Sequence, residues 1–194
     1  MTRAIRLDEL VSILRGNTPA LPSGDPSGPR VIGQSEIVSG GSAPVRHVDY
    51  SRVQPGLAPV LLAADDVVLA AMDRSHRSLL IDDELAGAVL GRECLALRIA
   101  TPNSPIRPAY LAAWTRSPEF QTLASAGMVG TTMPRLSPKT LGSFLIPILS
   151  QERQMRIERL VREFASAQAA LARTENLLQR LEVAELSGAF KEEL

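Results

Sequence analysis

Three segments of the chain gather side chains that can bind phosphate or the edges of nucleic-acid bases. They are Arg46, His47, Tyr50 and Arg52, then Arg74, Ser75, His76 and Arg77, and finally Thr131, Thr132, Arg135 and Lys139. An arginine fork matches a phosphate or a guanine edge, and serine, threonine and histidine can donate to either. Similar polar groups decorate the surfaces of many proteins. The residue types alone therefore leave a nucleic-acid contact and ordinary surface polarity both open.

The familiar catalytic constellations lack their residues in this sequence. His47 and His76 are not at zinc-ligand spacing, and there is no nucleophile elbow, P-loop, dinucleotide-binding glycine motif or DPPY-like tetrapeptide. Ser75 precedes His76 directly, so on a strand end the two side chains would point to opposite faces. A metal site at Asp65 and Asp66 would need further ligands, which the sequence does not require. We therefore expect both to be solvated carboxylates in a turn before a strand. We expect no catalysis and no metal site.

Composition places the chain among globular proteins. Of its 194 residues 45% are apolar, and the formal net charge is zero, which argues against an independent, strongly basic nucleic-acid binder. All but two of the 21 basic residues are arginine, the exceptions being Lys139 and Lys191. Cys94 is the single cysteine, and no apolar run approaches the roughly eighteen residues that span a bilayer. The opening MTRAIRLDEL lacks the apolar core of a signal peptide, so we expect a cytoplasmic protein.

The elements that would position the three polar segments are short. Apolar spacing in residues 6–15 predicts an amphipathic helix ended by Gly16, and a Pro-, Gly- and Ser-rich loop follows. We expect strands in residues 31–38, 45–48, 67–71, 78–81, 93–99 and 144–148. We expect helices at 108–116, from Ser117-Pro118 to Gly127 and after Ser137-Pro138, with residues 127–134 as a glycine-containing loop whose amides can approach phosphate. The fold class is thus α+β, with a mixed sheet and short helices.

One long amphipathic segment follows this domain. Ser150 is a good N-cap, and no Gly or Pro occurs after it until Gly188, which allows about ten turns and a length of roughly 50 Å. Apolar or small residues recur in a heptad pattern at Ile157, Leu160, Phe164, Ala167, Leu171, Thr174, Leu178 and Leu181. This seam favours a coiled coil with another chain over a helix packed along its own domain. We therefore divide the chain into a domain, residues 1–149, and a helical extension with a short tail, residues 150–194.

The order of these elements resembles the specificity (S) subunit of type I DNA restriction–modification enzymes, in a half-length form. The likeness covers residues 6–185 and is carried by RLDELVSILRGNTP, by AADDVVLAAM and most of all by the stretch from RPAYLAAW to SQERQMRI. Met72 and Arg74 stand where family members often have a glycine-containing turn, and PILSQERQ replaces the usual PLPPLEEQ. The family's full-length members hold two target recognition domains and two helices, whereas this chain has one of each.

The resemblance implies a subunit that reads DNA and does no chemistry itself. In such systems each recognition domain reads one half of a split target, and the helices act as a ruler between the halves. The helices also dock methyltransferase subunits, which use S-adenosylmethionine and can recruit a motor–nuclease subunit, so no cofactor is expected in this chain. A half-length chain would dimerise through its helix. A helix of roughly 50 Å spans about one and a half turns of B-DNA at about 34 Å per turn.

Two other functions remain open from the sequence. One is a coiled-coil adaptor whose globular part binds protein and prefers no duplex. The other is a small α/β hydrolase or transferase with a site around His47, Asp65 or His76. A recognition domain of a related defence methyltransferase is a third possibility within the DNA-reading class.

Overall fold

A computed structural model describes residues 3–17, 28–38, 47, 58–72, 77–130 and 134–192. In the C-terminal helix the backbone is described throughout. Its side chains are described for residues 151–164 and for Ala167, Ala170, Leu171, Thr174, Glu175, 177–180, Glu182 and Val183.

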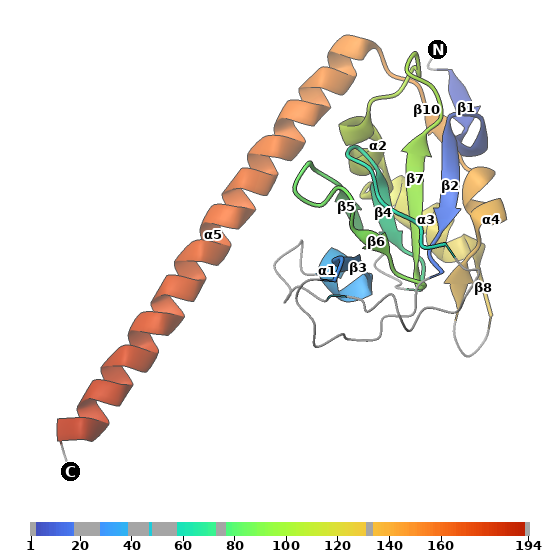
Figure 1. Ribbon diagram of the computed structural model, residues 1–194. Coiled ribbons are helices and arrows are strands. Elements are labelled where there is room, and N and C mark those ends of the chain that lie inside the picture. The colour runs from blue at the N-terminus through green and yellow to red at the C-terminus, as the bar shows by residue number, and fades with distance from the viewer. Residues whose placement is uncertain are drawn as a thin grey trace.

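A four-stranded antiparallel sheet forms the centre of the domain (Figure 1). Its strands, in spatial order, are β2 Val11–Arg15, β7 Cys94–Ile99, β4 Val67–Ala70 and β5 Ser78–Leu80. Strand β7 pairs with β2 on one side and β4 on the other, with Val11 opposite Ile99 and Ala70 opposite Cys94. The sheet therefore joins strands that are far apart in the sequence.

Three short helices cover one face of this sheet. They are α2 Pro108–Thr115, α3 Pro118–Gly127 and α4 Pro138–Gly142, each with proline in its first turn. The side chain of Ser117 accepts a hydrogen bond from the Phe120 amide at 3.2 Å, and that of Ser137 accepts from the Thr140 amide at 3.0 Å. These are the predicted serine caps, which pair amides that the helix itself leaves open.

Three short two-stranded pairs complete the domain. Strand β1 Ala4–Arg6 pairs antiparallel with β10 Leu145–Pro147, and β8 Met128–Val129 pairs antiparallel with β9 Arg135–Leu136. Strand β3 Val31–Ile32 pairs parallel with β6 Val89–Leu90, and helix α1 Gln34–Val38 follows β3. Together β3, α1 and β6 form a second layer over the other face of the sheet.

Both faces of the sheet are buried, which explains the continuous apolar run of β4. Side chains alternate along a strand, so neighbouring residues enter different cores. The helix-side core takes Val67, Leu69, Leu95 and Leu97, together with an edge-to-face aromatic group of Trp114, Phe120 and Phe144. The second-layer core takes Val68, Ala70, Cys94 and Ala96.

Helix α5 Gln151–Glu192 contains 42 residues and is about 63 Å long. Its first turns lie against α2, and the rest projects from the domain as one rod (Figure 1). Ser150 accepts a weak hydrogen bond from the Arg153 amide at 3.4 Å, as expected of an N-cap. The helix continues past Gly188.

Three sequence-based predictions of local structure were wrong. Residues 6–15 instead form a 3₁₀ turn, η1 Leu7–Glu9, followed by strand β2. In this arrangement Leu7, Leu10 and Val11 still reach the core, so their spacing does not distinguish it from a helix. Residues 31–38 form a two-residue strand and then a helix. The predicted loop 127–134 contains β8 and leads to β9, although residues 131–133 lie outside the described part.

The mixed architecture itself, with sheets and several short helices, is confirmed. The predicted strands at 67–71, 78–81 and 93–99 and the predicted helices at 108–116 and 117–127 are found within a residue or two of their expected bounds. Of the expected strand at 45–48, only His47 is described, and it forms an isolated bridge with Arg30.

Candidate nucleic-acid interface and helix junction

The two ends of strand β7 define two ends of the domain. Ala70 pairs with Cys94 at the first residue of β7, so β4 ends and turns toward β5 there. At the last residue, Ile99, the chain leaves toward residues 100–107 and the start of α2. Six residues of strand separate these ends by about 17 Å.

Two of the three predicted polar segments meet at the Cys94 end. The Leu136 amide donates to the carbonyl of Ala71 at 2.9 Å, and Arg135 Nη2 lies 3.2 Å from the sulfur of Met72. On the other side of the β4–β5 connection, the carbonyl of Arg77 accepts from the Ala70 amide at 3.2 Å. We call residues 70–72, Arg77 and residues 135–136 the strand-end face. Arg77 is exposed and Arg135 is half-buried.

The other described members of the predicted site lie elsewhere. His47 stands beside Arg30 in the second layer, and its Nδ1 donates to the carbonyl of Gly28. Lys139 is exposed on α4, and no described contact brings it to Arg77. The remaining predicted residues lie outside the described part of the chain: Arg46, Tyr50, Arg52, Arg74, Ser75, His76, Thr131 and Thr132.

The acidic pair before β4 has a role that the sequence did not reveal. Asp65 is exposed with a positive φ of 71°, whereas Asp66 is buried. Both Asp66 oxygens accept from Arg98, and one also accepts from the Ala63 amide at 2.8 Å. The expectation of two solvated turn carboxylates is therefore wrong for Asp66, which joins a turn to the central strand.

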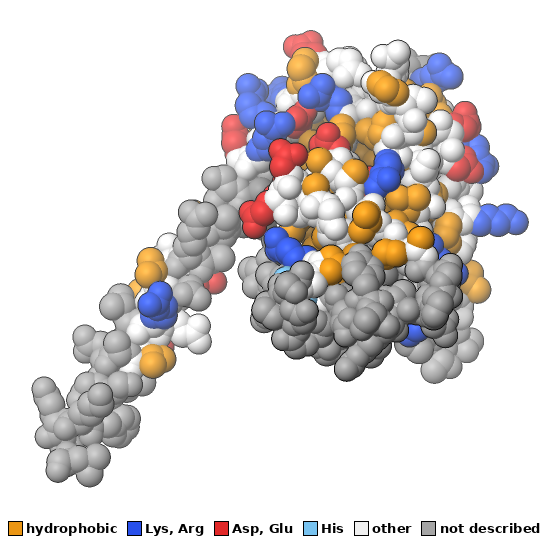
Figure 2. Space-filling view, in the orientation of Figure 1, with side chains coloured by type: hydrophobic (Ala, Val, Ile, Leu, Met, Phe, Trp, Pro, Cys, Tyr) orange, Lys and Arg blue, Asp and Glu red, His pale blue; other side chains and the backbone are white. Residues whose placement is uncertain are grey.

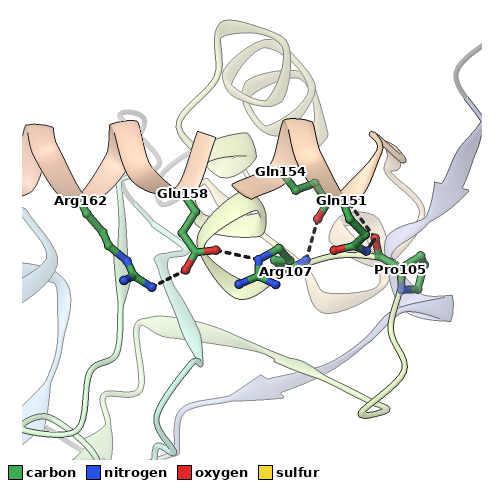
Figure 3. Close-up of polar contacts among 6 residues, drawn as sticks. All are labelled: Pro105, Arg107, Gln151, Gln154, Glu158 and Arg162. Atoms are coloured by element: carbon green, nitrogen blue, oxygen red, sulfur yellow. Dashed lines mark hydrogen bonds and ion pairs between the residues drawn. The ribbon is translucent and has the colours of Figure 1, made fainter. Parts of the chain in front are cut away.

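At the Ile99 end of the domain, polar contacts fasten α5 to the residues before α2 (Figure 3). Gln154 is fully buried, and its amide makes three hydrogen bonds. Its oxygen accepts from the Arg107 amide at 2.8 Å, and its nitrogen donates to the carbonyls of Pro105 at 2.7 Å and Leu149 at 2.9 Å. This use of both ends of the side-chain amide explains why a polar residue tolerates burial there.

One turn further along α5, an ion pair supports the same junction. Arg107 Nε donates to Glu158 at 2.7 Å, and Arg162 pairs with the other oxygen of that carboxylate. The hydrogen bond from Arg107 holds the pKa of Glu158 below its usual value, and Arg162 contributes further. We call Pro105, Arg107, Gln151, Gln154, Glu158 and Arg162 the α5 junction.

Two hollows flank this junction. One, of about 510 Å³, is mainly apolar and is lined by Tyr110, Trp114, Leu123, Leu145, Pro147 and Ile157, among others. The other, of about 650 Å³, lies along the opposite side of the first turns of α5 and is lined by Ser150, Glu152, Arg153, Met155, Arg156 and Arg159. The base of α5 thus has one face attached to the domain and one basic face open to solvent.

The predicted seam is exposed along the projecting part of α5. Leu160, Phe164, Leu171 and Leu178 are 44%, 69%, 64% and 62% exposed, and hydrophobic side chains are visible there in Figure 2. Ala167 and Thr174 are also exposed, and Leu181 lies outside the described side chains. Ile157 instead packs partly against the domain core. Four large apolar side chains at heptad positions are therefore largely exposed in the described part of the chain.

No other chemistry emerges from the described residues. They contain no group of three or more His, Cys, Asp or Glu side chains that could hold a metal ion. Among them, no helix has the length and apolarity needed to cross a membrane. Cys94 is buried in the second-layer core.

Sequence reasoning missed the α5 junction. In the sequence, Gln154 stands out only as part of the stretch SQERQMRI that opens the predicted helix. The available signal was its spacing. Gln154, Ile157 and Glu158 stand at i, i+3 and i+4, so they share one helix face, which is the face that meets the domain. Arg107 gave no signal, since its amide and guanidinium act on residues about fifty positions away.

Solved structures, but no sequence families, resemble this chain. No protein-family model and no curated protein matches the sequence. Among solved structures, the HsdS subunit from Thermoanaerobacter tengcongensis matches with a TM-score of 0.58 and 20% identity, covering 89% of this chain and 39% of that one. The type I restriction–modification S subunit from M. genitalium matches with a TM-score of 0.62 and 16% identity, covering 89% of this chain and 41% of that one.

A third match comes from work on complex assembly and conformational transition of the type I R-M system. It has a TM-score of 0.60 and 24% identity and covers 93% of this chain and 43% of that one. The chain thus spans about two fifths of the length of each of these structures. The predicted resemblance is confirmed at the level of the fold.

Proposed function

We propose that this chain, which has the fold of type I restriction–modification specificity subunits, is a non-catalytic component that reads DNA sequence for a methyltransferase. The observation that carries the proposal is the extent of the likeness, which reaches 89–93% of the chain in three solved structures. Fold alone does not fix function. The placement of polar side chains and the exposed helix support the proposal independently.

The strand-end face is the part that we assign to DNA. It joins Arg77 and Arg135, whose guanidinium groups suit guanine edges and phosphates. In the sequence, its residues adjoin the segments that contain Arg74, Ser75, His76, Thr131 and Thr132. We propose that these residues contact double-stranded DNA. We extend the proposal to Arg46, His47, Tyr50, Arg52 and Lys139 on their residue types alone.

The seam of α5 is the part that we assign to assembly. Exposed apolar side chains at heptad spacing favour pairing with another helix, because pairing removes their surface from water. Two copies joined in this way would read two equal half-sites separated by a spacer. The same helices would dock a methyltransferase subunit, which brings S-adenosylmethionine, and that complex can take up a motor–nuclease subunit.

The adaptor interpretation shares the helix and differs in the role of the domain. The exposed seam supports it as well as it supports the specificity subunit, because a coiled coil serves either. The hydrolase interpretation gains no support, since His47 bonds a backbone carbonyl and Asp65 is an exposed turn residue. DNA preference is therefore the property that separates the remaining functions.

The decisive experiment is co-expression of this chain with its candidate methyltransferase subunit, followed by base-modification sequencing of the host DNA. We expect a split, palindromic modified motif that disappears when this chain is omitted. A split but asymmetric motif would mean that a different second recognition chain takes part. Co-purification without sequence-dependent modification would favour the adaptor, and absence of any complex would overturn the assignment.

A further inference from the structure

We propose that Gln154 is a positioning residue that sets the direction in which α5 leaves the domain. Through that direction, and resting on the function proposed above, Gln154 also sets the spacing between the two halves of the DNA target. The inference concerns a residue that touches no DNA. It starts from three hydrogen bonds made by one buried side chain.

Gln154 joins three places on the chain at one point. The carbonyl of Pro105 and the amide of Arg107 belong to the segment before α2, and the carbonyl of Leu149 belongs to the segment before α5. The side chain is 0% exposed, so water does not compete for these groups. Gln151 adds a weaker contact to the Pro105 carbonyl at 3.3 Å.

Hydrogen bonds define a direction where apolar packing does not. Apolar contacts at this junction, such as that of Ile157 with the core, hold α5 against the domain, and the hydrophobic effect that drives them is itself non-directional. A planar amide with three partners has a narrow range of good geometry. We therefore assign the choice of orientation to Gln154, with the Arg107–Glu158 ion pair one turn away as a second restraint.

The length of α5 magnifies any change at its base. The described side chains from Arg162 onward are exposed, so the domain restrains only the first three turns. For a helix of 42 residues, about 63 Å long, a tilt of about 10° at the base moves the far end by about 11 Å. That is about three base-pair steps of B-DNA at about 3.4 Å each.

The test compares helix directions in the full-length protein. Nitroxide labels on cysteines introduced at Ala126 in α3 and Gln179 in α5, both exposed and off the seam, report the angle as a distance. Cys94 is 0% exposed and stays unlabelled. Distances are measured by pulsed electron paramagnetic resonance. Labelled protein is diluted with unlabelled protein so that only distances within one chain contribute.

The variant Gln154→Met keeps the approximate volume of the side chain and removes all three hydrogen bonds. We expect its distance distribution to shift or broaden by several ångströms relative to the parent. The matched control is Arg153→Ala, an exposed neighbour on the same helix, which should leave the distribution unchanged. An unchanged distribution in a Gln154→Met protein that melts cooperatively overturns the proposal.

A second variant covers the case in which Gln154→Met does not fold. Gln154→Glu keeps an acceptor for the Arg107 amide and, when ionised, loses the two bonds donated to Pro105 and Leu149. It too should shift or broaden the distribution, and an unchanged distribution in the folded Gln154→Glu protein overturns the proposal in the same way.

Base-modification sequencing supplies the functional readout. With Gln154→Met we expect altered or additional spacer lengths between half-sites whose own bases are unchanged. A merely structural role would lower modification at every site and leave the spacing as it was. If the parent protein yields no split motif, the proposed function fails while the distance measurement still judges the role of Gln154.

Discussion

Arg98 donates from Nε and Nη2 to the two carboxylate oxygens of Asp66, at 2.8 and 2.7 Å. Arg98 lies near the end of β7, and Asp66 directly precedes β4, so the pair crosses between neighbouring strands. The Asp66 side chain is 1% exposed, whereas that of Arg98 is 40% exposed. The same arginine donates to the carbonyl of Leu61 at 2.9 Å. One guanidinium therefore holds the turn before β4 against the central strand.

Replacing Asp66 with alanine should destabilise the domain by about 2–3 kcal/mol, because the Ala63 amide loses its acceptor and Arg98 loses its buried partner. The exposure of Arg98 keeps the cost below that of a fully buried pair. The measurement is the free energy of unfolding in urea. Asp83→Ala, at an exposed turn position, is the control and should change it by less than about 0.5 kcal/mol.

The phenol of Tyr110 should make stability depend on pH in the alkaline range. Its hydroxyl donates to the carbonyl of Pro147 at 2.6 Å, and burial raises its pKa above the ordinary value of 10.0. Above that value the unfolded chain loses the proton before the folded chain does. The contribution is therefore full below the unfolded pKa and is lost as pH rises through the folded pKa.

Only two tyrosines are present, so Tyr50→Phe leaves Tyr110 as the single phenol to titrate. We expect its absorbance change near 295 nm to occur above pH 10, and to return to the ordinary range in urea. In Tyr110→Phe the alkaline loss of stability should be smaller than in the parent. A titration midpoint at the ordinary value in the folded Tyr50→Phe protein would contradict this account.

Arg77→Ala should weaken binding to the cognate duplex by about 1–3 kcal/mol and relax one position of the target, if Arg77 reads a guanine. The measurement is fluorescence anisotropy of the protein–methyltransferase complex with cognate and single-substituted duplexes. The control is Arg159→Ala, on the basic face of α5 away from the strand-end face. Equal weakening on every duplex would make Arg77 a phosphate contact, and unchanged binding would remove it from the interface.

Phe164→Glu should abolish self-association through α5. Phe164 is 69% exposed on the chain itself, so the substitution leaves the domain intact while placing a charge in the seam. Light scattering during gel filtration should give the mass of one chain of 20.9 kDa instead of two. Gln179→Glu, on the same helix and off the seam, should keep the mass of the parent. A parent protein that is itself monomeric at micromolar concentration would refute the homodimer.

Local sequence signals were reliable where the interactions that form an element lie within a few residues of one another. Ser117-Pro118 and Ser137-Pro138 begin helices as predicted, because the cap and the proline act within one turn. The run 67–70 is a strand buried on both faces, which its four consecutive apolar residues indicate. These predictions require no knowledge of residues that are distant in the sequence.

The signals failed where a distant partner decides. The spacing of Leu7, Leu10 and Val11 suits a helix, yet β7 supplies a complete set of strand partners for residues 11–15, and the extended form wins. The sequence named Arg77 and Arg135 as candidate DNA contacts, which stays a prediction. It did not indicate that contacts with residues 70–72 would place both at one end of the sheet. It could not identify the α5 junction, whose partners are backbone groups near residue 105.

The pairing of β1 with β10 has a consequence for the order in which the protein folds during synthesis. The ribosome releases residues 4–6 first, but their partners at 145–147 follow only after nearly the whole domain has been made. Strand β2 likewise waits for β7, whereas β4 can pair at once with β5. Contacts so distant in sequence slow folding, because a long loop must close before they form. We therefore expect the β4–β5–β7 region to form first and the N-terminal strand to dock last, just before the chain continues into α5.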